Sequence, residues 1–209
     1  LTLTSEWRHY RWPAVTPKEK VPGLHDSDGY LWRRVIDVVQ NATVEEVKTE
    51  IKAQIDRAIS RGIQPGHIDT HMGTLYGHPL FTKTYIDVAM EYQIPAMVIE
   101  MTPENRKKFR AQGYPINDQM LALMNDYDLP KIDDFYAAPD GKSYEHKREM
   151  FMDLVKSLKP GITEIIFHPS IETEGLKKIT NSWKQRVWEA RLFSDPAVKA
   201  FLKSEGVLF

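Results

Sequence analysis

The chain has 209 residues, of which 42% are hydrophobic and 27% charged, and its formal net charge is −1. This balance is typical of a globular protein with one sizeable core, and it lacks the basic surplus of a nucleic-acid-binding protein. No cysteine is present, so any metal must be held by His, Asp or Glu. No apolar run is long enough to suggest a membrane span, and a cytoplasmic location is the default expectation.

Residues 1–42 are predicted to form an ordered loop rather than a helix, because prolines interrupt them repeatedly. The segment is rich in aromatic side chains, namely Trp7, Tyr10, Trp12, Tyr30 and Trp32. Flat rings of this kind stack on sugars, although packing beneath a long loop explains them equally well.

The next segments alternate between helical and strand patterns. Thr43 and Glu46 form a capping-box pattern at the start of a predicted helix, which Gly62 ends. Residues 63–70, 94–100 and 163–167 are predicted strands, and further helices are expected at 79–92, 103–112, 116–125, 143–158, 181–193 and 196–204. Short apolar strands between amphipathic helices favour a mostly parallel sheet in a single α/β domain over residues 1–209.

A cluster of ligand-type side chains follows the predicted strand at 63–70. The segment Gly66-His67-Ile68-Asp69-Thr70-His71-Met72-Gly73 contains two imidazoles and a carboxylate at alternate positions. In a strand, alternate side chains point to one face, so His67, Asp69 and His71 are expected to lie together. Such a group suits a divalent metal and its supporting residues, or a proton-transfer site. The plainer alternative is one packed histidine and one that caps a turn.

A second histidine stands at the end of another predicted strand. His168 follows residues 163–167 and precedes Pro169. Functional groups of parallel α/β proteins gather at the carboxyl ends of strands, so His71 and His168 are expected to contribute to one site. Alone, a histidine before a proline is usually only a turn residue.

Three segments together resemble the YdjC-like carbohydrate deacetylases, a family that includes the chitooligosaccharide deacetylases. His67-Ile68-Asp69-Thr70-His71 is similar to the family signature H-[IL]-D-[ST]-H. Leu1-Thr2-Leu3-Thr4 resembles the stretch after a family metal-binding histidine, and Gly161 to Pro169 resembles a late strand of the pattern G-x-T-E-[IL]-x-x-H-P. The chain departs from the family at Met72-Gly73-Thr74, where many members carry a His-His pair.

The resemblance implies a fold and a chemistry. The fold would be a distorted (β/α) barrel resembling a TIM barrel, and the reaction would remove an N-acetyl group from a small carbohydrate with the help of Mg²⁺ or Zn²⁺. By this resemblance His71 is a metal ligand and His168 the general acid, with Asp69 as the supporting carboxylate. His67 and Arg186 are the candidates for substrate binding, although a helix salt bridge explains Arg186 equally well.

The resemblance also carries expectations about the rest of the protein. A metal-binding aspartate, a metal-binding histidine and the general base would lie upstream of Leu1, so residues 1–209 are expected to lack the first strand or strands. It points further to a homodimer, with an acetylated sugar as substrate. Two other functions fit the bare residues: a metal-dependent phosphoesterase or isomerase, and a non-catalytic carbohydrate-binding protein that uses the aromatic loop.

Overall fold

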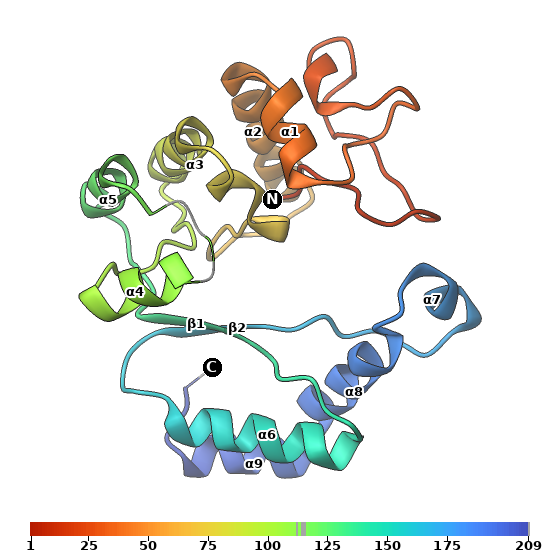
Figure 1. Ribbon diagram of the computed structural model, residues 1–209, viewed down its shortest axis with the longest axis vertical. Coiled ribbons are helices and arrows are strands. Elements are labelled where there is room, and N and C mark those ends of the chain that lie inside the picture. Colours follow the sequence, from red (N-terminus) through yellow and green to blue (C-terminus); the bar gives the residue numbers. More distant parts are fainter. Residues whose placement is uncertain (112, 114–115, 209) are drawn as a thin grey trace. The chain divides into compact units, whose positions relative to one another are not determined.

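The computed structural model describes residues 1–111, 113 and 116–208 (Figure 1). The chain forms two compact units, Leu1–Ile132 and Asp133–Phe209. The single domain expected over residues 1–209 stays a prediction. Among the described helices, none combines the length and the apolar character that crossing a lipid bilayer requires.

The first unit opens with the irregular aromatic segment that the prolines predict. Its regular structure before residue 35 is a short 3-10 helix, η1 (Pro22–Leu24). A helix that the sequence did not predict, α1 (Val35–Asn41), ends the segment. The Arg34 side chain accepts no hydrogen bond from the backbone N–H groups of the first turn, so no capping pattern marks the start of this helix.

The longest helix of the first unit is α2 (Val44–Ser60), and it begins as predicted. Thr43 Oγ1 accepts from the Glu46 N–H, and the Glu46 carboxylate accepts from the Thr43 N–H, which completes the capping box. Val47, Ile51 and Ile55 bury its apolar face. The predicted stop at Gly62 is confirmed by a positive φ of 82°, a conformation that glycine adopts without strain.

The remaining helices of the first unit lie close to their predicted positions. They are α3 (Pro79–Tyr92), α4 (Pro103–Ala111) and α5 (Asp118–Asn125). The 3-10 segment η2 (His71–Tyr76), which precedes them, was not predicted as a helix. Gln112, which was expected to end the helix now labelled α4, lies outside the described residues. Figure 1 shows α3 between α2 and α5, and α3 contacts both of them.

The predicted (β/α) barrel is wrong. In the described residues the only sheet consists of two short parallel strands, and about half of the chain is helical. The expected strands at 63–70 and 94–100 keep only isolated parallel bridges, Ile68 to Ala96 and Ile99 to Ile132. Each of these two segments contains a proline, which cannot donate to a ladder. In addition, the Val98 N–H donates to the Ala96 carbonyl two residues back, which bends the second segment locally.

The second unit contains the sheet and the last four helices. Strand β1 (Asp134–Ala137) pairs in parallel with β2 (Thr163–Ile166), and α6 (Tyr144–Ser157) connects them. Then follow α7 (Glu174–Ile179), α8 (Trp183–Ser194) and α9 (Pro196–Ser204). The core of this unit joins α6, α8 and α9 through the side chains of Tyr144, Phe151, Val155, Leu192 and Val198. Strand β1 and helix α7 were not predicted from the sequence.

Candidate functional site

The signature segment lies beside the first residues of the chain. The His71 N–H donates to the Leu1 carbonyl at 2.9 Å, and the Thr4 hydroxyl donates to the Met72 sulfur at 3.4 Å. On its other side the signature pairs with Ala96 through Ile68. Two of the segments that carry the family resemblance are therefore neighbours in space, although about seventy residues separate them.

A tight turn fixes the backbone just after His71. Met72 and Gly73 both have positive φ angles, 55° and 63°, inside η2. This conformation is costly for a residue with a side chain, so neighbouring contacts must hold Met72 in it. The Thr74 hydroxyl donates to the His71 carbonyl at 2.8 Å and closes the turn. The backbone that carries His71 is thereby fixed on both sides of the residue.

The imidazole of His71 contacts a carboxylate that the sequence reasoning did not single out. His71 Nε2 lies within hydrogen-bond distance of Glu6 Oε2, at 3.0 Å, and both side chains are partly exposed. Glu6 lies two residues after Thr4, the last residue of the segment that resembles the family sequence following a metal-binding histidine. This position in the sequence was the signal that could have identified it. The pair joins an imidazole and a carboxylate, which are the two ligand types available to this cysteine-free chain.

The other two residues of the signature have different surroundings. Asp69 Oδ1 accepts from the N–H of the next residue, Thr70, at 2.5 Å, and the side chain of His67 is exposed. Over residues 1–111, 113 and 116–208, no three His, Asp or Glu side chains gather closely enough to hold a metal ion. The roles expected for Asp69 and His67 stay predictions.

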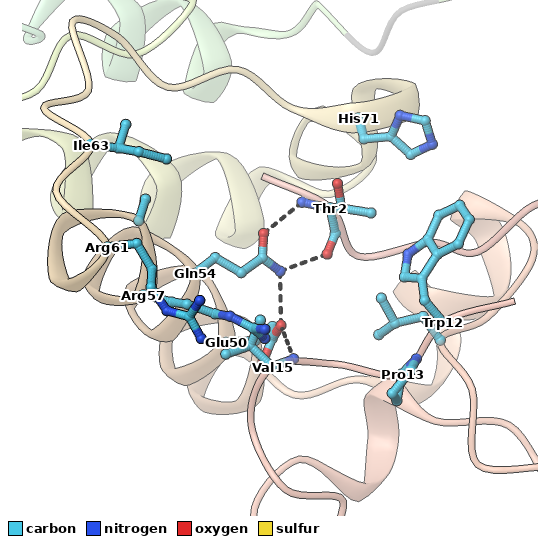
Figure 2. Close-up of a pocket in the computed structure, with 12 residues that line it drawn as sticks. Thr2, Trp12, Pro13, Val15, Glu50, Gln54, Arg57, Arg61, Ile63 and His71 are labelled. Atoms are coloured by element: carbon cyan, nitrogen blue, oxygen red, sulfur yellow. Dashed lines mark hydrogen bonds between the residues drawn. The ribbon is translucent and has the colours of Figure 1, made fainter.

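His71 lines a pocket of about 530 Å³ within the first unit. Figure 2 shows His71 and Trp12 on one side of this pocket and Arg57 and Arg61 on the opposite side. Neither arginine side chain forms an ion pair with a described residue, so this wall is cationic. The indole of Trp12 offers the kind of flat apolar surface on which a sugar ring stacks.

Helix α2 holds the loop that carries Trp12. The Glu50 carboxylate is fully buried and accepts from the N–H groups of Val15 and Thr16, each at 2.8 Å. One turn later Gln54 accepts from the Thr2 N–H and donates to the Thr2 carbonyl (Figure 2). Because Glu50 and Gln54 are four residues apart, they share one face of the helix and secure the pocket wall at two points.

Glu6 lines a second pocket, of about 570 Å³, together with Trp32. Asp26 also lines this pocket and pairs with Arg11 at 2.7 Å. Burial opposes ionisation of Asp26, but hydrogen bonds from Arg11 and from the N–H of Tyr30 outweigh burial, so the pKa of Asp26 is lowered. The Glu6–His71 pair thus contributes one wall residue to each of two pockets that contain tryptophan.

In the second unit, His168 lies just beyond the carboxyl end of β2, and its side chain is exposed. Its backbone N–H donates to the Glu189 carboxylate of α8 at 2.5 Å. The buried Lys147 ammonium lies 2.9 Å from the same carboxylate and donates also to the Pro139 carbonyl. A buried ion pair therefore fixes the main chain that carries His168.

Arg186 lies on α8, as the sequence predicts. Its Nε donates to the Ser182 hydroxyl at 3.3 Å, and its carbonyl accepts from the Ser170 N–H. Ser170 follows His168 by two residues, so α8 supports this loop at a second point through the main chain of Arg186. A substrate-binding role for the Arg186 side chain stays a prediction.

Comparison with known proteins agrees with the signature. The family model described as "YdjC-like protein" matches residues 1–204. The chain belongs to the YdjC-like family. A carbohydrate deacetylase of Thermoanaerobacter pseudethanolicus (strain ATCC 33223 / 39E) is 27% identical over 196 residues, which are 94% of this chain and 70% of that protein. A carbohydrate deacetylase of Enterococcus faecalis (strain ATCC 700802 / V583) is 24% identical over 195 residues, 93% of this chain and 69% of that protein.

A solved structure resembles this YdjC-like chain over its whole length. It is the crystal structure of a protein from Enterococcus faecalis V583 that is named for a proposed cleavage of cellobiose phosphate. The TM-score is 0.73 with 24% identity, and the match covers 100% of this chain and 73% of the other. At this identity the likeness establishes a shared fold.

Proposed function

We propose that this YdjC-like chain hydrolyses the N-acetyl group of a small carbohydrate or oligosaccharide. The observation that carries the proposal is the place of His71, a residue of the family signature, in a pocket that Trp12 also lines. The names of two relatives that align with more than nine-tenths of the chain support the same activity. An indole can hold the sugar ring while polar groups at the pocket act on its acetamido substituent.

His168 is the proposed general acid. An amine cannot leave as an amide anion, so a proton must reach the nitrogen as its bond to the carbonyl carbon breaks. An imidazole titrates near neutral pH and is suited to this transfer. The side chain of His168 is exposed, while Glu189 holds its main chain. This combination keeps the ring accessible on a fixed backbone.

A divalent ion, Mg²⁺ or Zn²⁺, is the proposed cofactor, with His71 as one of its ligands. The imidazole of His71 and the carboxylate of Glu6 match the sulfur-free chemistry of such an ion. When bound, the ion lowers the pKa of a water molecule and polarises the acetyl carbonyl. The described residues supply only part of a ligand set, because no third ligand-type side chain joins the pair.

The roles of the other predicted residues follow from the chemistry expected around the substrate. Asp69 is proposed as a supporting carboxylate, and His67 and Arg186 as groups that bind the sugar. The homodimer that the family resemblance implies and the default cytoplasmic location are kept as expectations. So are the upstream aspartate and histidine.

The test is acetate release from N,N′-diacetylchitobiose, measured before and after chelation of the protein. We expect release that chelation abolishes and that Mg²⁺ or Zn²⁺ restores. His168→Ala should keep its metal content and lose turnover by about 10²–10⁴-fold, the usual contribution of a general acid. His9→Ala removes an exposed histidine and is the matched control.

Four outcomes would contradict parts of the proposal. Folded, metal-loaded protein that releases no acetate would exclude deacetylation of this substrate. Release that chelation leaves unchanged would exclude the metal. Sugar binding without turnover, unaffected by metal removal, would favour a non-catalytic carbohydrate-binding protein. Normal turnover in His168→Ala would remove His168 from the mechanism.

A further inference from the structure

The contact between Glu6 and His71 determines which nitrogen of the imidazole carries a proton. An ionised carboxylate can only accept a hydrogen bond, so His71 Nε2 is the donor across the 3.0 Å to Glu6 Oε2. In a neutral imidazole the other nitrogen, Nδ1, then has a free lone pair. Nδ1 has no hydrogen-bond partner among the described residues. The imidazole therefore keeps one nitrogen available for a ligand.

Both partners of this contact are held in place by their main chains. The His71 N–H and carbonyl are bonded to Leu1 and Thr74, and the Glu6 carbonyl accepts from Arg33 Nε at 3.2 Å. A partly exposed pair on mobile side chains would lose most of its energy to side-chain entropy. Here the backbones are already fixed at both ends, so the contact has to order only the two side chains.

We propose that Glu6 is the positioning residue of the metal site and that His71 binds the metal through Nδ1. The inference rests on the proposed function, because that function makes His71 a metal ligand. Metal-binding histidines almost always donate their second N–H to a carboxylate, a carbonyl or water, which fixes the tautomer and the ring orientation. Glu6 occupies this position in the structure, whereas Asp69, the carboxylate expected from the sequence, accepts from the N–H of Thr70.

The test is Zn²⁺ affinity, measured on metal-free protein by competition with a chromophoric chelator, with circular dichroism to verify folding. Glu6→Ala removes the acceptor and should weaken Zn²⁺ binding about 10–100-fold, the usual cost of losing such a partner. Glu6→Gln keeps an acceptor oxygen and should lose clearly less. Glu19→Ala removes an exposed carboxylate of the same unit and should bind Zn²⁺ like the unchanged protein.

The outcomes separate this inference from the proposed function. If His71→Ala loses Zn²⁺ affinity while Glu6→Ala does not, the positioning role of Glu6 is wrong and His71 remains a ligand. If His71→Ala binds Zn²⁺ normally, the metal assignment of the proposed function fails as well. If Glu6→Gln loses as much affinity as Glu6→Ala, Glu6 acts as a direct ligand, which overturns positioning through Nε2.

Discussion

Glu50 in the first unit and Glu189 in the second are both buried helix glutamates, and their carboxylates are stabilised in different ways. Glu50 of α2 forms no ion pair with a described residue and accepts from two backbone N–H groups and from Gln54 Nε2. Glu189 of α8 lies against the buried ammonium of Lys147 and accepts from the His168 N–H. Both carboxylates nevertheless perform one task, because each fixes the main chain of a loop that carries a proposed site residue.

The difference predicts how each unit responds to a substitution. A carboxylate held by neutral N–H groups loses hydrogen bonds when it is changed, and each bond to a charged group contributes about 1.5–3 kcal/mol. A carboxylate held by a buried cation leaves an unpaired charge when the cation is removed, which costs about 3–5 kcal/mol. Loss of the cation in the second unit should therefore be the more damaging change.

Lys147→Met gives the largest expected effect. It should lower the free energy of unfolding of the second unit by about 3–5 kcal/mol, because Glu189 then stays buried without its cation. Urea unfolding, with hydrogen exchange to assign the loss to this unit, is the measurement. Adding Glu189→Gln should recover much of the loss, since the amide oxygen still accepts from the His168 N–H.

Lys142→Met, at an exposed position of the same unit, is the control and should change little. A loss below about 1 kcal/mol in Lys147→Met would show that the ion pair contributes little beyond its hydrogen bonds. A double variant no more stable than Lys147→Met would show that the unpaired charge is not the cause.

Glu50→Gln gives the next largest effect, in the first unit. The amide keeps one oxygen but turns an NH₂ group toward one of the two N–H groups of Val15 and Thr16. We expect a loss of about 1.5–3 kcal/mol in urea unfolding, together with faster hydrogen exchange at these two amides. Glu45→Gln, exposed on the same helix, should leave both quantities nearly unchanged. Unchanged exchange at Val15 and Thr16 in Glu50→Gln would contradict the holding role.

The sequence predicted the elements that local patterns determine. The capping box at Thr43 and Glu46, the helix that begins at Pro79 and the strand before His168 are all found. It did not predict the loss of the strand ladders at 63–70 and 94–100, because single bridges depend on long-range pairing and local bends. The barrel that the family resemblance implied was wrong because it required these strand ladders to form.

In the candidate site, too, the local pattern was predicted from the sequence and the long-range contact was not. The signature identified His71, but its contact with Glu6 depends on the path of an irregular loop that has no periodicity to read. The burial of Glu46 and Glu50 was also not predicted, since glutamates on an amphipathic helix are ordinarily expected to face water. Their burial makes sense only once the loop that supplies their N–H donors is in place.

A substitution of Glu46 is expected to have the smallest effect on stability, and this effect should depend on pH. Burial raises its pKa, but the N–H groups of Thr43 and Gly23 and the Thr43 hydroxyl outweigh burial, so the pKa lies below the ordinary value of 4.5. A lowered pKa in the folded state means that the carboxylate stabilises the fold above pH 4.5. This contribution disappears as the pH falls through the folded-state pKa.

Glu46→Gln should therefore cost about 0.3–1 kcal/mol at pH 7, the usual contribution of a carboxylate in the first turn of a helix. Because a protonated glutamate resembles glutamine, the two proteins should approach equal stability at a second, acidic pH that lies below the folded-state pKa of Glu46. Urea midpoints at both pH values check this, with Glu19→Gln as a control that shows no such convergence. An equal difference in stability at both pH values would mean that Glu46 holds Gly23 and Thr43 without the help of its charge. Glu46 would then differ from Glu50, one turn later, which holds its loop as a charged carboxylate.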